Sequence, residues 1–591
     1  MMETFCDSCS QHLKNFMELI QRASENLLQK IKYFFASIQH CCCLKRNKPE
    51  SKRFYKPVLQ QHEKEAAQQF LQHVEESKVI DTECLEALRT LAASENPSLQ
   101  QSAALYYLHI SEQLKNELPE EYLEPYYDLL RSNDLEVQRK ASLSLVNLLV
   151  EGNVNKETVV QVGLLEPILE LLHSGDATVQ CNSCACVATL ATSVLNRNAI
   201  ASEGAIKSLL GLAKSYDPRV QQNAAGAILN LTRSENTQHL LCKEGALPVL
   251  ILQLQSPDSE VQYYSCSALT NIASNPQHHP SMLQIGDGIL FNMLQGLMSS
   301  TVVKVCCQAC YCLRNLFLNA DIQDDIVAMN YLPQLHELLK FSNKLVNEAA
   351  LSVLSILTEN HSNTSSGRQS RRDIGDQEIA WKAAIVSENI LKILGKLLLI
   401  YRTNPRVSNY VGNIIQKLAT SKTQQDIIDS RCVVVLLQVF GLLTIHDESL
   451  LYVTACIAQL TNNEIIRTHV IQESDANIAA HLLMLSSQSG NIDLSFQAAY
   501  IISQLGQDEM FTLLLRPHIR EIVGYVLRFL KHQEIRFQHL GLLTIRNLRK
   551  DSHFAAVFSE RQLIEQLNNV SQQTTEIQDL LQAVLYQKVE N

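Results

Sequence analysis

The sequence has 591 residues, and its composition and charge exclude several classes of protein. Gly and Pro account for only 33 residues, less than half of the usual share of roughly 12%, while hydrophobic residues reach 46%. This excludes collagen-like, low-complexity and wholly disordered chains and argues against an all-β fold. The 50 basic against 61 acidic residues, a net charge of −11, disfavour nucleic acid as the main partner.

Residues 1–40 predict an amphipathic helix that does not share the pattern of the rest of the chain. Its apolar side chains recur at helical spacing and are therefore expected on one face. They are Leu13, Phe16, Met17, Ile20, Ala23, Leu27, Ile31, Phe34, Phe35 and Ile38.

Residues 41–57 combine a cysteine cluster with a basic segment and predict a membrane anchor. Clustered cysteines beside an amphipathic helix are typical of S-palmitoylation, so Cys41, Cys42 and Cys43 are the candidate lipidation sites. Acyl chains combined with basic residues hold a chain stably on anionic lipid. The candidate lipid-facing basic residues are Lys45, Arg46, Lys48, Lys52, Arg53 and Lys56.

Other interpretations of this terminus remain open. One alternative is that the helix caps the repeats that follow, which is compatible with lipid anchoring. Another is that the cysteines are inert. A third alternative is a zinc site formed by Cys6 and Cys9 with the later cysteines and His12 or His40, although the adjacent cysteines fit tetrahedral spacing poorly. The N-terminus lacks the features of a signal peptide, and no apolar stretch reaches 18 residues, so we expect a cytosolic chain with reduced cysteines.

From residue 58 to 591 a block of about 42 residues recurs, with a Val-Gln pair near its start. We count about 11 copies, anchored on an apolar residue at positions 110, 148, 190, 231, 272, 316, 357, 418, 460, 505 and 548. One copy reads as three helices over 220–231, 236–244 and 246–254, with Gly245 as a left-handed helix cap. Gly163 and Gly204 occupy the same place in neighbouring copies. Three helices in such a block are the armadillo pattern, so we predict an all-α armadillo superhelix.

The one long gap between anchors indicates an inserted loop at 361–378. It is rich in Ser, Asn, Arg and Gly and surrounds Ser370 with Arg368, Arg371 and Arg372. The alternatives are a kinase target at Ser370 and a plain solvated loop.

No motif of catalysis or metal binding stands out, so we expect neither an enzyme nor a cofactor. His278-His279 lies in a Pro-flanked turn. Two groups of cysteines replace small core residues of other copies, so we interpret these cysteines as core residues. These are Cys181, Cys184 and Cys186, and Cys306, Cys307, Cys310 and Cys312.

The last helix of each repeat is expected to line a concave groove that binds partner peptides. Asparagines share one position there, and a ladder of amides can hydrogen-bond an extended peptide backbone. Each amide would equally tie neighbouring repeats together. The candidate groove residues are Asn147, Asn230, Asn271, Arg314, Asn315 and Asn547.

Three segments resemble the vacuolar protein 8 family of armadillo proteins: 223–232 with 244–250, 258–264 and 99–105. The likeness extends from about residue 58 to 550, and Cys41-Cys42-Cys43-Leu44-Lys45 resembles the acylated cluster of that family. The resemblance implies a lipid-anchored adaptor on the cytosolic face of a vacuolar or lysosome-like membrane. It would recruit partner peptides for organelle tethering, inheritance or autophagy-type targeting.

The chain departs from that family at several positions. Met2 stands where the family has a myristoylated Gly, and the helix ahead of the cysteines is additional. Of the three arginines that precede the groove asparagine in the family, Arg314 fits, but Ser355 and Gln416 occupy the next two positions. The identity of the partners is therefore open.

Two other classes of armadillo adaptor are alternatives. Nuclear import receptors pair a groove Trp with the Asn, but the single Trp381 lies elsewhere. A cell-adhesion or cytoskeletal adaptor would concentrate at cell contacts. At the position where an import receptor would carry its Trp, four residues before the asparagines, this chain has Leu143, Gly226, Ser267 and Tyr311.

Overall fold

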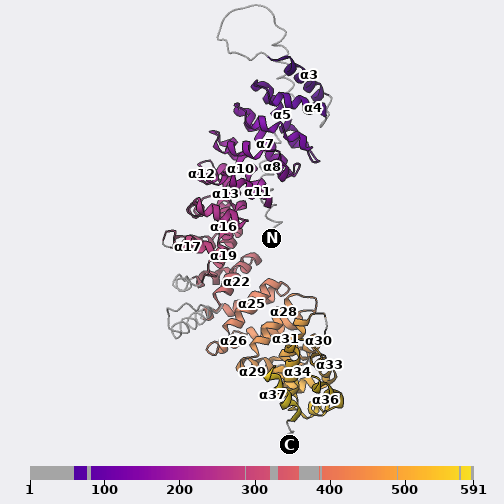
Figure 1. Ribbon diagram of the computed structural model, residues 1–591. Helices are drawn as coiled ribbons and strands as arrows, with labels where there is room; N and C mark the ends of the chain where they lie inside the picture. The colour runs from indigo at the N-terminus through magenta and orange to yellow at the C-terminus, as the bar shows by residue number, and fades with distance from the viewer. Residues whose placement is uncertain are drawn as a thin grey trace, which may run out of the picture. The chain divides into compact units, whose positions relative to one another are not determined.

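The computed structural model describes residues 59–75, 82–286, 288–319, 331–358, 385–386, 389–488, 490–570 and 574–586. Within these residues every regular element is a helix, which confirms the predicted all-α class (Figure 1). The chain divides into two compact units, residues 1–297 and 298–591. The predicted helix of 1–40, the anchor segment 41–57, the loop 361–378 and Trp381 lie outside the described residues.

The N-terminal unit contains short and long helices in a recurring order. Its α-helices are α3 (Gln61–Glu75), α4 (Thr82–Ala92), α5 (Pro97–Gln113), α6 (Tyr126–Leu130), α7 (Leu135–Glu151), α8 (Lys156–Gln161), α9 (Leu165–Glu170), α10 (Ala177–Leu190), α11 (Val194–Ser202), α12 (Ala205–Leu212), α13 (Pro218–Leu231), α14 (Glu235–Lys243), α15 (Ala246–Gln253), α16 (Ser259–Ala273), α17 (His279–Leu283) and α18 (Ile289–Met298).

The C-terminal unit continues the same order. Its α-helices are α19 (Val303–Leu316), α21 (Leu332–Lys340), α22 (Lys344–Leu357), α24 (Ile390–Ile400), α25 (Pro405–Leu418), α26 (Gln424–Asp429), α27 (Cys432–Leu442), α28 (Ser449–Leu460), α29 (Glu464–Glu473), α30 (Ala476–Ser487), α31 (Ile492–Leu505), α32 (Glu509–Leu515), α33 (Ile519–Leu530), α34 (Ile535–Leu548), α35 (Ser552–Phe558), α36 (Arg561–Asn568) and α37 (Thr575–Tyr586).

The long last helix of each repeat, which we call the third helix, carries the core. In the N-terminal unit α5, α7, α10, α13 and α16 pack in succession, and in the C-terminal unit α19, α22, α25, α28, α31, α34 and α37 do so. All eleven anchor positions lie on these helices; ten are buried, and Leu357 is half-buried. Because a third helix contacts its neighbours on both sides, stacking covers apolar surface that one repeat would leave exposed.

The recurring polar residues fix where each third helix begins. Before α10, the Asp176 carboxylate accepts hydrogen bonds from the N–H groups of Thr178 and Val179 at 3.1 and 3.0 Å. The Gln180 amide donates to the carbonyl of Ser174 at 2.7 Å, and Val179 is fully buried. The Val-Gln pair therefore recurs because its Val packs in the core and its Gln binds the turn before the helix. Equivalent carboxylate caps start α7, α13 and α16 at Asp134, Asp217 and Asp258.

Glycines join the first and second helices, as the sequence predicted. Gly163, Gly204 and Gly245 have φ values of +85°, +80° and +82°, a region that strongly favours glycine. The helices around Gly245 also follow the prediction, since α13, α14 and α15 agree with 220–231, 236–244 and 246–254 within two residues.

Three first helices of the N-terminal unit, α11, α14 and α17, also supply a polar side chain that binds the end of the preceding third helix. Free carbonyls at a helix C-terminus need such donors when they are buried. The donors recur every 41 residues: Arg197 to Ala191 at 2.9 Å, Gln238 to Thr232 at 2.8 Å and His279 to Ala273 at 2.8 Å. His279 of the Pro-flanked turn therefore has a structural contact.

The cysteine groups lie in the core, as interpreted from the sequence. All seven are buried on α10 and α19, and burial raises the pKa of Cys307 to about 12. The Cys306 thiol donates to the carbonyl of Met298 at 3.1 Å. They fill space as small apolar residues do.

An ion pair at the start of α10 predicts a pH-dependent contribution to stability. Arg139 contacts Asp176 at 2.5 Å, and its hydrogen bond lowers the pKa of Asp176 to about 2. The pKa of this carboxyl in the unfolded chain is about 3.9, so its contribution is present above that pH and is lost as pH falls toward 2. Because Arg139 is 38% exposed, screening limits the gain to about 1 kcal/mol.

We therefore expect Asp176→Asn, which keeps the cap oxygen, to lower the free energy of unfolding by about 1 kcal/mol at neutral pH. Urea unfolding followed by circular dichroism measures this. The difference from wild type should shrink between about pH 4 and pH 2. Exposed Asp128→Asn is the control, and an equal, pH-independent loss in both variants would contradict the assignment.

Candidate protein-binding face

The candidate groove residues all lie on third helices, close to their C-terminal ends. Asn147, Asn230 and Asn271 lie on α7, α13 and α16, and Arg314-Asn315 and Asn547 lie on α19 and α34. We call the side of the third helices that carries these positions the third-helix face of each unit. The structure places the asparagines in register but gives them different exposure.

Asparagine amides at these positions contact the preceding repeat. Asn147 donates to the Ser111 hydroxyl at 3.1 Å, Asn230 to the Ala188 carbonyl at 2.8 Å and Asn271 to the Thr232 hydroxyl at 3.0 Å. The fourth, Asn547, donates to the Ser503 carbonyl at 2.8 Å. These NH₂ groups therefore tie adjacent repeats together, whatever else the side chains bind.

A second amide ladder lies two turns earlier on the third helices, and sequence reasoning missed it. Asn182 donates to the Ser142 hydroxyl at 3.0 Å, and Asn223 donates to the Cys181 carbonyl at 3.2 Å. The signal was present in the repeat alignment, since 182 and 223 precede the anchors 190 and 231 by the same eight residues.

The asparagines differ in what remains available to a ligand. Asn147 and Asn547 are 1% and 3% exposed, whereas Asn271 and Asn315 are half-buried and reach the surface. A side chain with exposed polar atoms can add a hydrogen bond to a peptide, but a buried one cannot without moving. The surface-accessible members of the ladder are therefore at α16, in the N-terminal unit, and at α19, in the C-terminal unit.

Arg314, which precedes Asn315 on α19, is the positively charged residue among the candidate groove residues. Its Nη1 donates to the Asn315 side-chain oxygen at 3.2 Å, and its buried Nε has no hydrogen-bond partner among the described residues. A guanidinium held at one side by an amide presents its remaining N–H groups in a fixed plane. This geometry suits a carboxylate.

An ion pair adjoins this position on the next two third helices. Glu348 of α22 is 6% exposed and pairs with Arg406 of α25 at 3.0 Å. Burial, with the nearby Glu348 carboxylate, raises the pKa of half-buried Tyr311 far above its usual value. This part of the face therefore carries charge and phenol groups together.

The middle of the N-terminal third-helix face has no aromatic anchor at the position expected for an import receptor. A Cβ atom on Gly226 would lie 3.7 Å from the ring of Tyr264, which is buried at 5% exposure. The Tyr264 ring therefore covers the space beside Gly226. Ser267, the equivalent residue on α16, is also buried.

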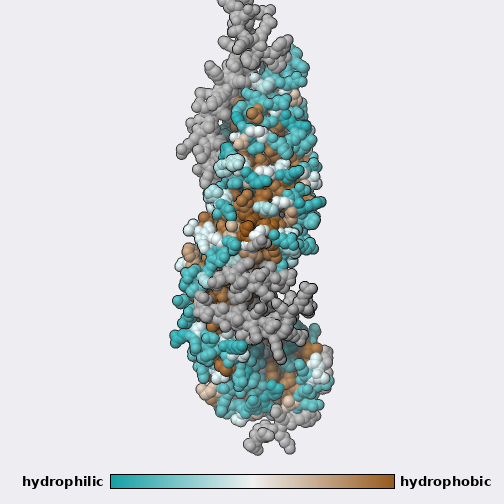
Figure 2. Space-filling model, turned by 90° about the vertical axis from the view of Figure 1, so that its left-hand side faces the viewer, coloured by the Kyte–Doolittle hydropathy of each residue, from teal (hydrophilic) through white to brown (hydrophobic). Residues whose placement is uncertain are grey.

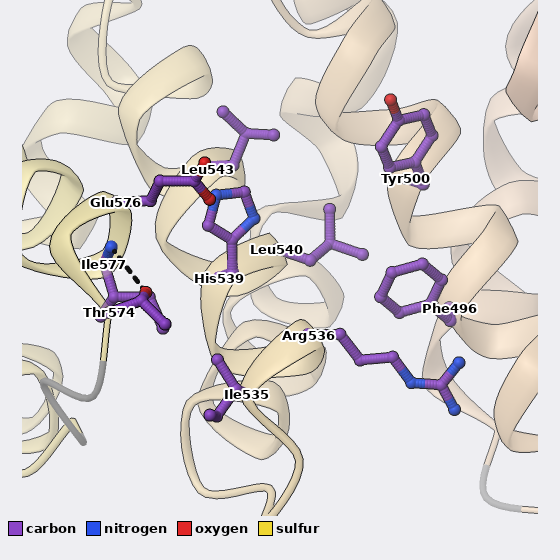
Figure 3. Close-up of a pocket in the computed structure, with 10 residues that line it drawn as sticks. All are labelled: Phe496, Tyr500, Ile535, Arg536, His539, Leu540, Leu543, Thr574, Glu576 and Ile577. Atoms are coloured by element: carbon purple, nitrogen blue, oxygen red, sulfur yellow. Dashed lines mark hydrogen bonds between the residues drawn. The ribbon is translucent and has the colours of Figure 1, made fainter.

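The C-terminal unit contains a pocket of about 290 Å³ between α31, α34 and α37 (Figure 3). Figure 3 shows α31 side chains on one side, the start of α37 on the other and α34 between them. Sequence reasoning missed this site, because it followed only the asparagines and their immediate neighbours. Its lining residues are Phe496, Tyr500, Ile535, Arg536, His539, Leu540, Leu543, Thr574, Glu576 and Ile577.

The surface of the N-terminal unit is also partly apolar. In the view of Figure 2, hydrophobic residues gather in the middle of this unit and are bordered by hydrophilic residues. Large apolar side chains elsewhere on the unit are exposed too, including Val194 at 69% and Leu195 at 74%. Contiguous apolar surface of this kind is typical of protein-contact sites.

The candidate lipidation site lies outside the described residues, as do the basic residues that follow it. This holds for Cys41, Cys42 and Cys43 and for the segment 45–56. Among the helices that the structure describes, none combines the length and hydrophobicity needed to span a bilayer.

Comparison with known proteins agrees with this fold. Residues 152–192, 193–233 and 234–274 match the armadillo/beta-catenin-like repeat, and each range ends with one third helix, α10, α13 or α16. An engineered protein superposes with a TM-score of 0.60 at 22% identity, over 73% of this chain and 99% of that one. A chain from a structure of the interaction between cadherin and beta-catenin superposes with a TM-score of 0.60 at 14% identity, over 85% of this chain and 98% of that one. The chain therefore has the armadillo-repeat fold.

Among curated proteins the chain is similar to vacuolar protein 8. It is 40% identical to that of Komagataella pastoris over 126 residues, 21% of this chain and 22% of the relative. It is 44% identical to the relative from Gibberella zeae over 111 residues, which are 18% of this chain and 20% of the relative. It is 38% identical to the relative from Schizosaccharomyces pombe over 130 residues, which are 22% of this chain and 23% of the relative. The resemblance to vacuolar protein 8 is confirmed, and each match spans about a fifth of the relative, less than the predicted 58–550.

The inter-repeat contacts predict that replacing Asn547 or Asn271 by alanine lowers the free energy of unfolding by different amounts. Asn547→Ala removes a buried hydrogen bond and should lower the free energy of unfolding by about 1–2 kcal/mol, whereas Asn271→Ala should cost about 0.5 kcal/mol because water replaces the lost partner. Denaturant unfolding of both variants measures this. Equal costs would contradict the burial argument.

Proposed function

We propose that this chain is a lipid-anchored armadillo adaptor that recruits partner peptides to the cytosolic face of a vacuolar or lysosome-like membrane. The observation that carries the proposal is the similarity to vacuolar protein 8 in a chain with the armadillo fold. The processes served would be organelle tethering, inheritance or autophagy-type targeting.

Partner binding is proposed for the third-helix face. Asn271 and Asn315 reach the surface, and Arg314 presents a guanidinium that is fixed by Asn315. Within the C-terminal unit, the half-buried Asn315 amide suits a peptide backbone and the fixed Arg314 guanidinium suits a carboxylate, so an acidic extended segment fits the α19 position. Asn147, Asn230 and Asn547 support the face by joining repeats.

Membrane attachment is proposed for the segment ahead of the repeats. Cys41, Cys42 and Cys43 are followed by six basic residues and one acidic residue, Glu50, before residue 57. Two or more acyl chains near anionic lipid give stable attachment, whereas one alone is reversible. The proposal therefore needs no membrane-spanning helix.

The three cysteines provide the first test. We expect the triple variant Cys41→Ser, Cys42→Ser and Cys43→Ser to move from the membrane pellet to the supernatant of a cell fractionation, because the basic residues alone bind weakly and reversibly. Cys242→Ser, a half-buried cysteine of the repeats, is the control. Unchanged pelleting of the triple variant would refute lipid anchoring, and cysteine-dependent enrichment at cell contacts would favour the adhesion class.

Arg314 provides the second test. We expect Arg314→Glu to weaken binding of an acidic partner peptide by at least about fivefold, since it replaces an attraction by a repulsion. Isothermal calorimetry with the full chain measures the loss. Arg520→Glu, an exposed residue of α33 with the same change in charge, is the control. Equal affinity of Arg314→Glu and wild type would exclude the α19 position from binding.

A further inference from the structure

Three successive second helices of the C-terminal unit carry an exposed aliphatic side chain near their C-terminal ends. These helices are α24, α27 and α30, and the side chains are Ile400, Leu442 and Met484, which are 67%, 56% and 51% exposed. The three residues follow one another at intervals of 42 positions, the length of one repeat. Single exposed aliphatic residues are normal on a protein surface, but residues that recur in register on adjacent helices form one apolar strip. We call this strip the second-helix edge.

Contacts between the three helices keep the second-helix edge in a fixed geometry. The Cys432 thiol of α27 donates to the carbonyl of Leu391 on α24 at 3.0 Å. The ring of Phe440, also on α27, stacks on His481 of α30 with the ring centroids 4.6 Å apart. The helices are therefore held without a ligand, and little ordering is needed when the edge contacts another surface.

The second-helix edge contains few charged groups. α24, α27 and α30 carry no acidic residue, and their two basic residues, Lys392 and Lys396, are exposed and form no ion pair among the described residues. The short turns that follow these helices add Arg402, Asp447 and Glu448. Helices and turns together hold three basic against two acidic residues, in a chain with a net charge of −11. The edge is therefore apolar, with a slight excess of positive charge.

Charged side chains return on both sides of the three helices. The next second helix, α33, exposes Arg520 and Glu521 and no large apolar side chain. On the other side α21 exposes Glu337 and Lys340, although the turn after it adds an exposed Phe341. The stretch without acidic residues thus spans α24, α27 and α30. An apolar surface bordered by charged residues is typical of a contact site.

The kind of side chain at the second-helix edge favours a lipid surface over a protein. Protein interfaces depend mostly on Trp, Tyr and Arg, whereas Leu is under-represented among the residues that dominate binding. Here the exposed residues are aliphatic, and each belongs to a different helix. The boundary between headgroups and acyl chains adapts to separate aliphatic side chains, and lysines beside them attract anionic headgroups.

We propose that the second-helix edge contacts the surface of an anionic bilayer. Ile400, Leu442 and Met484 enter the boundary between headgroups and acyl chains, and Lys392 and Lys396 lie beside anionic headgroups. The contact goes beyond the acylated segment 41–57 and rests on the proposed membrane location. Because no residue of a third helix belongs to the edge, a bilayer bound there leaves the third-helix face of the same unit free for a partner.

Vesicle flotation tests this contact with the full chain. The background is the triple cysteine variant named above, so that acyl chains cannot contribute, and the vesicles are phosphatidylcholine with or without phosphatidylserine. We expect the combined change Ile400→Ser, Leu442→Ser and Met484→Ser to weaken binding by at least about tenfold, because it removes the aliphatic surface that lipid would bury. All three residues are exposed, and circular dichroism checks that the fold is kept.

Two further variants serve as a control and as a test of charge. Val194→Ser with Leu195→Ser removes two aliphatic side chains of similar exposure from the N-terminal unit and should leave binding unchanged. Lys392→Glu with Lys396→Glu should weaken binding by about fivefold or more when phosphatidylserine is present. The same change should have little effect on vesicles of phosphatidylcholine alone.

A tryptophan at the second-helix edge shows whether the edge enters lipid. Leu442→Trp in a Trp381→Phe background leaves one tryptophan in the chain. Its emission should shift to shorter wavelength on vesicles and be quenched by lipids that carry bromine on their acyl chains. Leu195→Trp in the same background should show neither change.

Each other outcome has a defined meaning. Absence of vesicle binding, binding that survives the three edge substitutions, or Leu442→Trp emission that vesicles leave unchanged would overturn the proposal. An equal loss with the Val194 and Leu195 control would show unspecific adhesion and would also overturn it. Loss of a partner protein by the edge variant, with vesicle binding kept, would make the edge a protein contact and refute the bilayer.

The proposed lipid anchor and the second-helix edge fail separately. The vesicle experiment uses a chain without acylated cysteines, so its failure leaves the anchor proposal intact. Unchanged pelleting of the triple cysteine variant in cells would refute the anchor and would leave the vesicle result standing.

Discussion

The stacking of third helices is the constraint on which the rest of the structure depends. A helix such as α13 has buried residues around most of its circumference, including Val220, Ala224, Ile228 and Leu231. Its own repeat covers one side only, and α10 and α16 cover the others. The short polar motifs serve this packing, because a carboxylate at the start and a donor at the end of each helix let its termini lie beside the neighbouring repeats.

Stacking also limits what the third-helix face offers to a partner. An asparagine at this position has an NH₂ group and an oxygen, and in Asn230 and Asn547 the NH₂ group is bound by the previous repeat. A buried amide that already joins two helices has little to offer a peptide, since moving it leaves a buried carbonyl unsatisfied. Recognition must therefore come from the exposed residues around the ladder, which differ from repeat to repeat. Arg314 at α19 and the aromatic rings of α31 are two such sets.

The sequence was sufficient for the elements and for the core, and insufficient for the sites. The helices around Gly245 and the burial of Cys310 follow from local pattern, because period and turn chemistry are properties of a short segment. The direction of the Asn147 amide and the filling of the space beside Gly226 by Tyr264 depend on residues some 40 positions away. The pocket was missed for the same reason, since its lining comes from three helices.

The net charge of −11 describes the molecule less well than the placement of its carboxylates. Asp134, Asp176, Asp217 and Asp258 all count toward the total, yet each accepts hydrogen bonds at a helix start, and Asp176 also pairs with Arg139. Such carboxylates are compensated locally and contribute little to the field over the third-helix face. On α19, in contrast, Arg314 is held by the Asn315 amide and forms no ion pair with a carboxylate among the described residues. A chain that is acidic overall can therefore attract an acidic partner at one place and repel it elsewhere, which favours docking in one position.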